Sequence, residues 1–223
     1  YALAKAFDFA QQIRKTPIVV NDSPGFFTTR VFTTFVDEGI RLLEEGIHPA
    51  RIENLARMTG MPVGPLAVSD EVSQKLIVTI AETQHEHKNH ASLRVAKRLI
   101  DEFHRGGRAY GGGFYDYPED APKHLWAKLI SLYYDPKVLI DDHDIQERLL
   151  FRQVIEALRC YEEGVLNSVI DANIGSIYGI GFPAQTGGVL QFIKAYGETA
   201  FLERAIELAK RYGVRFTPPS TIP

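Results

Sequence analysis

The sequence has one cysteine, Cys160, and no surplus of basic residues. A single cysteine cannot form a disulfide within the chain, and it cannot supply the paired ligands of a cysteine-based zinc site. Lysine and arginine total 25 against 28 aspartates and glutamates, a formal net charge of −3. Because binding to DNA or RNA depends on basic side chains that neutralise phosphates, a nucleic-acid partner is not expected.

Long apolar runs are also missing. No stretch of about 18 apolar residues occurs, and the opening YALAKAFDFAQQIRK lacks the basic-then-apolar order of a secretory signal. Membrane association is therefore not indicated. What is present, 45% hydrophobic and 24% charged residues over 223 positions, is typical of a globular protein. Because the chain starts with Tyr1 inside a helical pattern, we expect it to be a piece of a longer protein.

The first part of the chain predicts a helix followed by a short strand. Apolar residues recur every three or four positions from Leu3 to Ile13, which predicts an amphipathic helix over residues 2–14. After Pro17, the continuous apolar run at residues 18–20 suits a buried strand. A lone helix and strand cannot form a sheet. The segment is interpreted either as the last crossover of an α/β domain whose other strands are absent, or as an irregular strap on a helical body.

A long amphipathic helix is predicted to begin near Gly25 and to end at Gly46, where glycine can take a left-handed cap conformation. Asp22 or Ser23 is placed to cap its start. Further helices are predicted after Pro49 and over residues 66–84, 91–104, 125–134, 144–164 and 198–212. The chain is therefore predicted to be mainly helical.

Two glycine-rich loops separate these helices. The loop GMPVGP at residues 60–65 combines glycines with prolines, which fixes unusual backbone angles. Residues 106–113 contain five glycines and precede the aromatic segment FYDY, which can pin a flexible segment onto a neighbouring surface. This run lacks the preceding strand and the following lysine of a phosphate loop, so we interpret it as a connector between two helical units.

The chain contains an internal duplication. EGIRLLEEG at residues 38–46 matches EALRCYEEG at residues 156–164, an offset of 156 − 38 = 118. Beyond the helix, GMPVG from Gly60 meets GFPAQ from Gly181 at an offset of 181 − 60 = 121. Two related helical units in one chain can pack around an approximate two-fold axis, as two subunits would. The stretch NDSPGFFTTR at residues 21–30 is interpreted as not repeated.

Two groups of residues suggest a site but also have simpler explanations. Thr28 and Thr29 lie in the first turn of the long helix, where free amides can hold an anion or a carbonyl, although most such turns are structural. His85, His87 and His90 suggest metal binding, but they form no HExxH motif. No metal is therefore expected.

Basic side chains and the cysteine are also ambiguous. A set of basic residues could meet the phosphates of a nucleotide-bearing substrate, or could form a solvated helix face: Arg94, Lys97, Arg98, Arg105 and Arg108. Cys160 replaces Leu42 of the other repeat. We interpret it as a small core residue and not as a nucleophile, because no paired histidine is evident nearby.

Five motifs, in their order and spacing, resemble the C-terminal part of multifunctional 3-hydroxyacyl-CoA dehydrogenases of fatty-acid β-oxidation, of the trifunctional α-subunit type. They are VVNDSPGFFTTRVF, EGIRLLEEG, GMPVGP followed by Asp70, GGGFYDY, and the later GIGFP. The resemblance covers nearly the whole chain. It implies a mainly α fold of two tandem, duplicated helical domains, similar to the 6-phosphogluconate dehydrogenase C-terminal domain. It also implies a remnant of an NAD-binding Rossmann domain at residues 1–22, a first helical domain at 23–117 and a second at 118–223.

The same resemblance implies the substrate-side part of an NAD-dependent (3S)-3-hydroxyacyl-CoA dehydrogenase. In that family a Rossmann domain binds NAD and carries the catalytic His-Glu pair, while two helical domains close over the acyl-CoA and replace the dimer interface of shorter relatives. Residues 1–22 match only the last helix and strand of the Rossmann domain. We therefore expect no cofactor bound by this chain, no complete catalytic set and no activity in isolation. An enoyl-CoA hydratase domain is expected in the parent protein, in the cytoplasm of a bacterium or in the mitochondrial matrix or peroxisome of a eukaryote.

Thr29 stands where many relatives carry the asparagine of GF-x-x-N-R, which helps to position substrate against the catalytic histidine. The trifunctional type also reads TTR at this place. A threonine hydroxyl is shorter than the amide, so it needs a closer approach or a bridging water. The resemblance implies that GMPVGP forms part of the acyl-binding cleft wall. The implied substrate-binding residues are Ser23, Gly25, Phe26, Thr29, Arg30, Pro62, Gly64 and Pro65.

Two other functions stay open at the level of the sequence. The helical units can be a non-catalytic assembly module that contacts a thiolase partner or a second copy of the chain, and an exposed apolar face over residues 2–13 would favour this reading. Alternatively, the chain is the helical domain of another nucleotide-dependent dehydrogenase, such as a 6-phosphogluconate-type enzyme. A missing duplication in the folded structure would favour that alternative.

Overall fold

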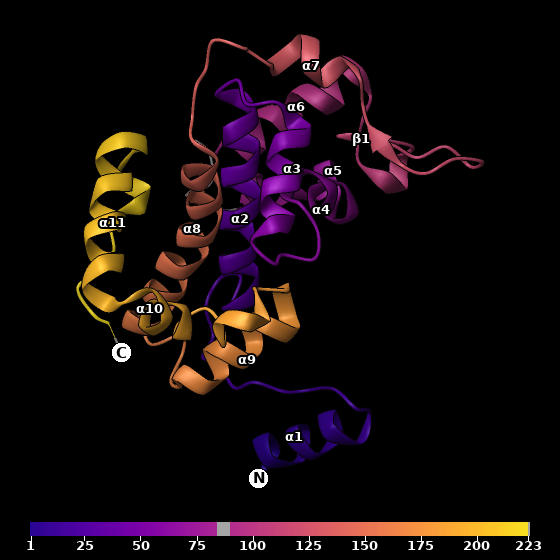
Figure 1. The fold of residues 1–223 in the computed structure, drawn as a ribbon. Coiled ribbons are helices and arrows are strands. Elements are labelled where there is room, and N and C mark those ends of the chain that lie inside the picture. The colour runs from indigo at the N-terminus through magenta and orange to yellow at the C-terminus, as the bar shows by residue number, and fades with distance from the viewer. Residues whose placement is uncertain (84–89, 223) are drawn as a thin grey trace. The chain divides into compact units, whose positions relative to one another are not determined.

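The computed structural model describes residues 1–83 and 90–222, and it is mainly helical, as the resemblance implies (Figure 1). The elements are α1 (Ala2–Gln12), α2 (Thr28–Glu44), α3 (Pro49–Met58), α4 (Pro65–Val72), α5 (Gln74–Thr83), α6 (Ala91–Phe103), η2 (Arg108–Tyr110), β1 (Tyr115–Asp116), β2 (His124–Leu125), α7 (Lys128–Tyr133), α8 (Asp142–Glu162), α9 (Val169–Ile180), η3 (Ala184–Thr186), α10 (Gln191–Tyr196), α11 (Glu198–Tyr212) and η4 (Val214–Phe216). The two strands form an antiparallel hairpin, and no other sheet forms among the described residues. Within those ranges, no helix has the length and apolar character needed to cross a membrane.

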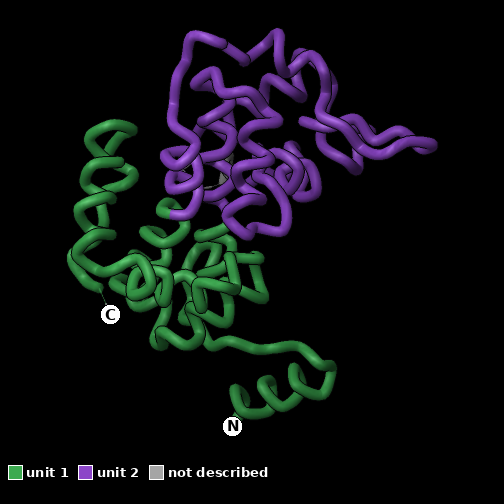
Figure 2. Tube along the Cα trace, viewed as in Figure 1, with its two compact units in different colours: residues 1–32, 151–223 green, residues 33–150 purple. Residues whose placement is uncertain are grey.

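The chain divides into two compact units (Figure 2). Unit 1 comprises residues 1–32 and 151–223, and unit 2 comprises residues 33–150. The breaks lie within the long helices α2 and α8, at equivalent points of the duplication, since 150 − 32 = 118. Each unit therefore combines the start of one long helix with the body of the other repeat. The domain boundaries after residues 22 and 117 follow the sequence repeats and stay a prediction.

The segment before α2 is a strap and not the predicted strand. Val20 makes one isolated antiparallel bridge with Leu166, and the Asn21 N–H donates to the Val165 carbonyl at 2.9 Å. No second strand lies beside it in the described chain, so the buried-strand prediction for residues 18–20 is wrong. The preceding helix is confirmed as α1, although none of its residues is buried.

The predicted start of α2 is wrong by nearly one turn. Gly25 and Phe26 take left-handed backbone angles, which a right-handed helix cannot include, and α2 begins at Thr28. Asp22 and Ser23 are therefore too far from the helix to cap it. The predicted end at Gly46 is confirmed by its left-handed φ of +100° directly after the helix.

One predicted helix, over residues 66–84, is split into α4 and α5. Ser73 separates them with φ +88°, and the Gln74 N–H donates to the Gly106 carbonyl at 2.9 Å instead of continuing a helical ladder. The glycine-rich segment at 106–113 thus packs against the α4–α5 junction inside unit 2, and it does not lie between the two compact units.

Each unit has its own apolar core. In unit 2 the core includes Ile40, Leu43, Ile52, Leu66 and Leu99, all with less than 1% of the residue exposed. In unit 1 it is rich in aromatic rings, among which Phe151 stacks on Phe201 with centroids 4.7 Å apart. Phe27, which immediately precedes α2, is also fully buried.

Candidate functional site

A tight turn builds the start of α2. Gly25 has φ +77° and Phe26 has φ +49°, and the Phe26 N–H donates to the Ser23 carbonyl at 2.8 Å. A left-handed conformation at a residue with a Cβ costs about 1–2 kcal/mol, so surrounding contacts must hold this turn. The turn leaves Phe26 51% exposed, directly before the helix begins at Thr28.

Two glycines of α9 allow the start of α2 to approach closely. A Cβ added at Gly175 would lie 3.2 Å from Cε1 of the buried Phe27. A Cβ added at Gly179 would lie 3.1 Å from Cγ2 of Thr28. Phe27 and Thr28 therefore face α9, whereas Thr29, the next residue along, is exposed.

Arg30 ties the same turn to α8. Its Nε and Nη2 donate to Glu156 Oε1 at 2.9 and 2.7 Å, and its Nη1 donates to Glu163 Oε2 at 2.5 Å. Partial burial opposes the charge, but the hydrogen bonds to the two glutamates outweigh it and raise the Arg30 pKa. The guanidinium that the resemblance assigns to substrate is thus engaged by two carboxylates, and its direct contact with substrate stays a prediction.

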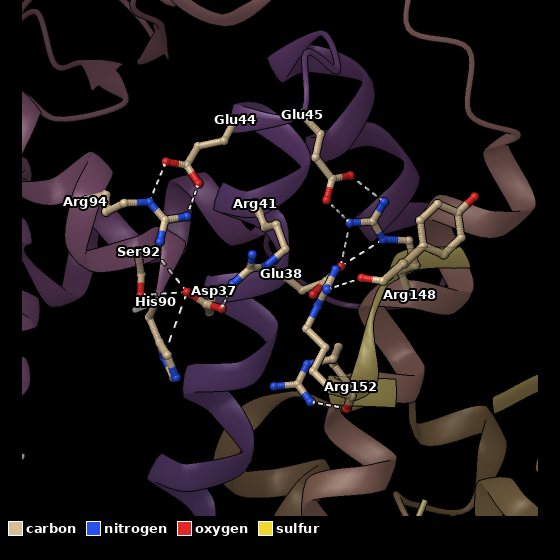
Figure 3. A network of polar contacts seen from close by, with 12 residues as sticks. Asp37, Glu38, Arg41, Glu44, Glu45, His90, Ser92, Arg94, Arg148 and Arg152 are labelled. Atoms are coloured by element: carbon tan, nitrogen blue, oxygen red, sulfur yellow. Dashed lines mark hydrogen bonds and ion pairs between the residues drawn. The ribbon is translucent and has the colours of Figure 1, made fainter. Parts of the chain in front are cut away.

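Unit 2 contains a second triad of the same composition (Figure 3). Arg148 Nε donates to Glu38 Oε1 at 2.8 Å, and its Nη1 donates to Glu45 Oε2 at 2.6 Å. The side chains of Arg148 and Glu38 are both fully buried. Burial opposes the charge on Arg148, but its two glutamates outweigh that effect and raise its pKa.

The two triads are copies of each other in the duplication. Arg30 corresponds to Arg148, since 148 − 30 = 118, and Glu38 and Glu45 correspond to Glu156 and Glu163 at the same offset. In each triad the arginine comes from one repeat and the glutamates come from the other. This reciprocity is the pattern of a two-fold interface, here closed within one chain. The interpretation that residues 21–30 are not repeated is therefore wrong at its last residue.

The segments that lead into the long helices are exchanged in the same way. The Asn21 Nδ2–H donates to the Gly164 carbonyl at 2.8 Å in unit 1. In unit 2 the Asp135 N–H donates to the Gly46 carbonyl at 2.9 Å. The two acceptors are equivalent glycines, since 164 − 46 = 118. The duplication is thus present in the hydrogen bonding as well as in the sequence.

The symmetry is broken at the start of α2. In the second repeat α8 begins at Asp142, and Glu147, the counterpart of Thr29, is only 5% exposed. The Arg148 side chain is 0% exposed, whereas that of Arg30 is 19% exposed. The position of Thr29 is therefore exposed in one copy and covered in the other, which makes the exposed copy the candidate site.

The predicted cleft-wall loop in unit 2 has a packing role. Glu53 Oε1 accepts the Leu66 N–H at 2.8 Å and caps α4. A Cβ at Gly64 would lie 2.4 Å from the Glu53 carboxylate, and a Cβ at Gly39 would lie 2.2 Å from Pro65. Gly64 and Pro65 are buried for these reasons, whereas Pro62 is exposed.

Two buried carboxylates hold the aromatic segment behind the glycine-rich loop. Asp70 accepts the N–H groups of Phe114 and Tyr115, both at 2.8 Å, and the hydroxyl of Tyr117 at 3.1 Å. Glu53 Oε2 accepts the Tyr115 hydroxyl at 2.7 Å. Burial raises the pKa of both carboxyl groups, against the opposing effect of these hydrogen bonds. The expected pinning of this segment is confirmed, with tyrosine hydroxyls as part of the attachment.

Most of the basic residues considered for phosphate binding form ion pairs. Arg94 pairs with a glutamate of α2, Arg98 pairs within its own helix, Arg105 pairs with an aspartate of β1, and Arg108 pairs with a glutamate of α4. These pairs satisfy the charges locally, so the arginines do not form a cluster that awaits an anion. The solvated-face interpretation describes them better.

The remaining candidates point to no metal and no nucleophile. His90 lies 3.9 Å from Asp37, while His85 and His87 fall outside the described residues. Within those residues, no group of three or more ligating side chains could hold a metal ion. Cys160 is fully buried, and burial raises the pKa of its thiol to about 12, so its interpretation as a core residue is confirmed.

The structure distributes the predicted substrate residues over both units. Unit 1 holds Ser23, Gly25, Phe26, Thr29 and Arg30. Unit 2 holds Pro62, Gly64 and Pro65. As substrate contacts all eight stay predictions. Sequence reasoning missed Glu156 and Glu163, although aligning the two repeats from Arg30 onward would have found them.

The chain is similar to a protein family and to a curated relative. A family model for the 3-hydroxyacyl-CoA dehydrogenase C-terminal domain matches residues 25–117. The chain is 36% identical over 232 residues to fatty acid oxidation complex subunit alpha of Shewanella frigidimarina. That alignment covers 99% of this chain and 32% of the relative, so the chain spans about a third of the length of this curated protein.

Two solved structures share the fold. The dehydrogenase part of multifunctional enzyme 1 from C. elegans matches with a TM-score of 0.69 and 22% identity, over 98% of this chain and 52% of that one. The 3-hydroxybutyryl-CoA dehydrogenase of Escherichia coli matches with a TM-score of 0.71 and 18% identity, over 98% and 63%. Residues 25–117 are therefore similar to the C-terminal domain of 3-hydroxyacyl-CoA dehydrogenases, and along nearly its whole length the chain is similar to a fatty acid oxidation complex subunit alpha.

Proposed function

We propose that this chain is the substrate-side part of an NAD-dependent (3S)-3-hydroxyacyl-CoA dehydrogenase that acts in fatty-acid β-oxidation. The observation that carries the proposal is the broken symmetry at the start of α2. The counterpart of Thr29 in the other repeat is the buried Glu147, whereas the Gly25-Phe26 turn leaves Thr29 itself exposed. We propose that this exposed turn faces the acyl-CoA and that Thr29 positions the reacting oxygen of the substrate.

The chemistry of Thr29 suits positioning and not acid-base catalysis. Its hydroxyl has one proton to donate and does not titrate near neutral pH. The first N–H groups of α2 also lack partners within the helix, and the helix dipole favours negative charge at this end. Donors at such a place stabilise an oxygen on which negative charge develops.

We propose that the described residues do not form an NAD site. Dinucleotides bind at the carboxyl ends of parallel strands beside a glycine-rich turn, whereas the only sheet within the described ranges is the short antiparallel hairpin β1–β2. We propose that NAD and the catalytic His-Glu pair belong to other parts of the natural gene product, together with an enoyl-CoA hydratase domain. The proposed location is the cytoplasm in a bacterium, or the mitochondrial matrix or peroxisome in a eukaryote.

The test compares two threonines of the same turn in the full natural gene product. Thr29→Val should lower kcat/KM for acetoacetyl-CoA reduction by NADH by about a hundredfold to a thousandfold, as expected for one lost donor at a reacting oxygen. Thr28→Val keeps the methyl group that contacts α9 and should stay within about twofold of the unmodified protein. Equal rates for both variants would contradict the role of Thr29.

Calorimetry on the 223-residue chain alone tests the assignment of the NAD site. We expect no binding of NAD, weak or no binding of acetoacetyl-CoA, and no oxidation of a 3-hydroxyacyl-CoA. Tight binding of NAD would contradict the assignment, because it requires a dinucleotide site within the chain.

A second candidate function is assembly, and α1 favours it. None of the residues of α1 is buried, and Leu3 and Phe9 are 60% and 61% exposed. Such a helix suits a contact with a thiolase-type subunit or with a second copy of the chain. Sedimentation of the natural gene product with and without Leu3→Glu and Phe9→Glu tests this function, and an unchanged assembly state would refute it. The reciprocal triads argue against the 6-phosphogluconate-type alternative, which a missing duplication would have favoured.

A further inference from the structure

We infer that Glu156 and Glu163 are positioning residues for the proposed reaction, and that they act on Thr29 through Arg30. The inference rests on the proposed function of the exposed turn. It assigns to the second repeat a role in the chemistry of the first, although the glutamates themselves do not touch substrate.

The contacts of the three residues around Thr29 fix the orientation of the turn. Phe27 is buried beside one glycine of α9, and Thr28 contacts the other. Arg30 is bound by Glu156 of α8 and by Glu163, which directly follows that helix. A helix places successive side chains about 100° apart, so residues held before and after Thr29 determine the direction of the one between them.

Arg30 is a strong attachment point because it is bound through several atoms. Its Nε and Nη2 both donate to Glu156 Oε1, and its Nη1 and Nη2 donate to the two oxygens of Glu163. Charge-assisted bonds to a planar guanidinium restrict rotation as well as distance. The main-chain atoms of Arg30 are thereby restrained, and they are bonded directly to those of Thr29.

The second triad serves as a control for stability. Arg148, Glu38 and Glu45 reproduce the same interactions, but the counterpart of Thr29 in that copy is the buried Glu147. If the triads serve only to join the repeats, losing either one should have the same kind of effect. If the triad of Arg30 also positions Thr29, only its loss should change catalysis in a way that depends on Thr29.

The experiment is a double-mutant cycle in the full natural gene product, assayed by NADH oxidation with acetoacetyl-CoA. Glu156→Gln should lower kcat by about tenfold and leave KM within about threefold, because a misplaced turn affects the transition state more than binding. In a Thr29→Val background the same change should have less than about a twofold effect, because coupled residues are not additive. Glu38→Gln should give the same small change in both backgrounds.

Hydrogen exchange gives a readout that does not depend on activity. In Glu156→Gln the amides of residues 31–34, the first that bond within α2, should exchange faster, and in Glu38→Gln those of residues 149–152 should do so. If the inner variants fail to fold, the pair Glu163→Gln and Glu45→Gln replaces them, since these carboxylates are 51% and 33% exposed.

The outcomes separate the two proposals. Additive effects of Glu156→Gln and Thr29→Val, or equal losses of kcat in Glu156→Gln and Glu38→Gln, would overturn the positioning role while the proposed function stands. An unmodified gene product without dehydrogenase activity would overturn the proposed function and this inference with it. Non-additive losses confined to the Arg30 triad would support both.

Discussion

Replacing Asp70 with alanine should detach the aromatic segment from the body of unit 2. The carboxylate accepts the N–H groups of Phe114 and Tyr115 at 2.8 Å, the Gln74 amide at 3.0 Å and the Tyr117 hydroxyl at 3.1 Å. Its side chain also fills the space beside Gly113, where a Cβ would lie 1.9 Å from Oδ1. Removing the carboxylate takes the shared acceptor from four donors that converge on one point.

The magnitude follows from the groups left without partners. Two backbone N–H groups that cannot move away cost about 1–3 kcal/mol each, or about 2–6 kcal/mol together. Burial raises the pKa of Asp70, which shows that a buried carboxylate charge itself costs free energy. Removing the carboxylate removes this cost, so we expect a net loss of stability of about 2–4 kcal/mol. For a protein of this size each kcal/mol lowers Tm by about 2–4 °C, which gives a decrease of about 4–16 °C.

The single tryptophan provides a local assay. The backbone N–H of Trp126 donates to the Phe114 carbonyl at 2.9 Å, and the Arg105 guanidinium lies 4.3 Å from the centroid of the Trp126 indole ring. Its emission therefore reports on the attachment of the segment, while circular dichroism reports on the helices. In Asp70→Ala the emission should shift to the red at temperatures where the helical signal is still native.

Asp70→Asn is the matched control. It keeps Oδ1 for Phe114 but presents an NH₂ group to the Tyr115 N–H, so one amide is orphaned and the loss should be about 1–3 kcal/mol. A Tm of Asp70→Ala within about 1 °C of the unmodified protein, with unchanged Trp126 emission, would refute the reasoning, because it would mean that water or another acceptor replaces the carboxylate.

Three further predictions follow from the buried charges and the thiol. Glu38→Ala should lower the free energy of unfolding, measured in urea, by about 3–5 kcal/mol, because it leaves the fully buried Arg148 with one partner fewer. Glu156→Ala should lower it by less, because its triad is partly exposed, and equal losses would contradict this reasoning. Burial raises the pKa of Glu53 above its ordinary 4.5. The stability contributed by the protonated carboxyl is therefore complete below pH 4.5 and is lost as the pH rises through the raised pKa. Glu53→Gln should remove this pH dependence from a plot of the urea midpoint against pH, and an unchanged plot would contradict the raised pKa. Cys160 should resist iodoacetamide at pH 8 until denaturant unfolds the protein, whereas rapid alkylation of the native protein would contradict its burial.

The sequence predicted the helices well where an apolar pattern and a glycine agreed. The final helix at residues 198–212 is confirmed at both ends, and α2 ends before Gly46 as predicted. The errors lie where tertiary contacts override local pattern. Ser73 breaks an otherwise helical pattern because a distant loop accepts the next N–H, and no propensity of residues 66–84 contains that information.

The candidate site was only partly predictable for a similar reason. Thr29 was identified from its place in a motif, but its exposure depends on the left-handed residues Gly25 and Phe26, which the predicted helix start near Gly25 did not include. The partners of Arg30 lie 126 and 133 positions away. Only the internal duplication could have connected Arg30 with Glu156 and Glu163, because an arginine and two glutamates occur at the same positions in both repeats.

The exchanged arginines have a consequence for how the two repeats stay together. A cut after residue 117 would leave Arg30 on one piece and its glutamates on the other, and the same would hold for Arg148. The second piece would lack the start of α2, which belongs to unit 1, and the first piece would lack the start of α8, which belongs to unit 2. Each piece therefore carries the helix start that the other one lacks. When both repeats are on one chain, these helix starts have a high effective concentration for each other. The covalent connection at residue 117, as well as the strength of the contacts, therefore keeps each repeat paired with the other repeat of the same molecule.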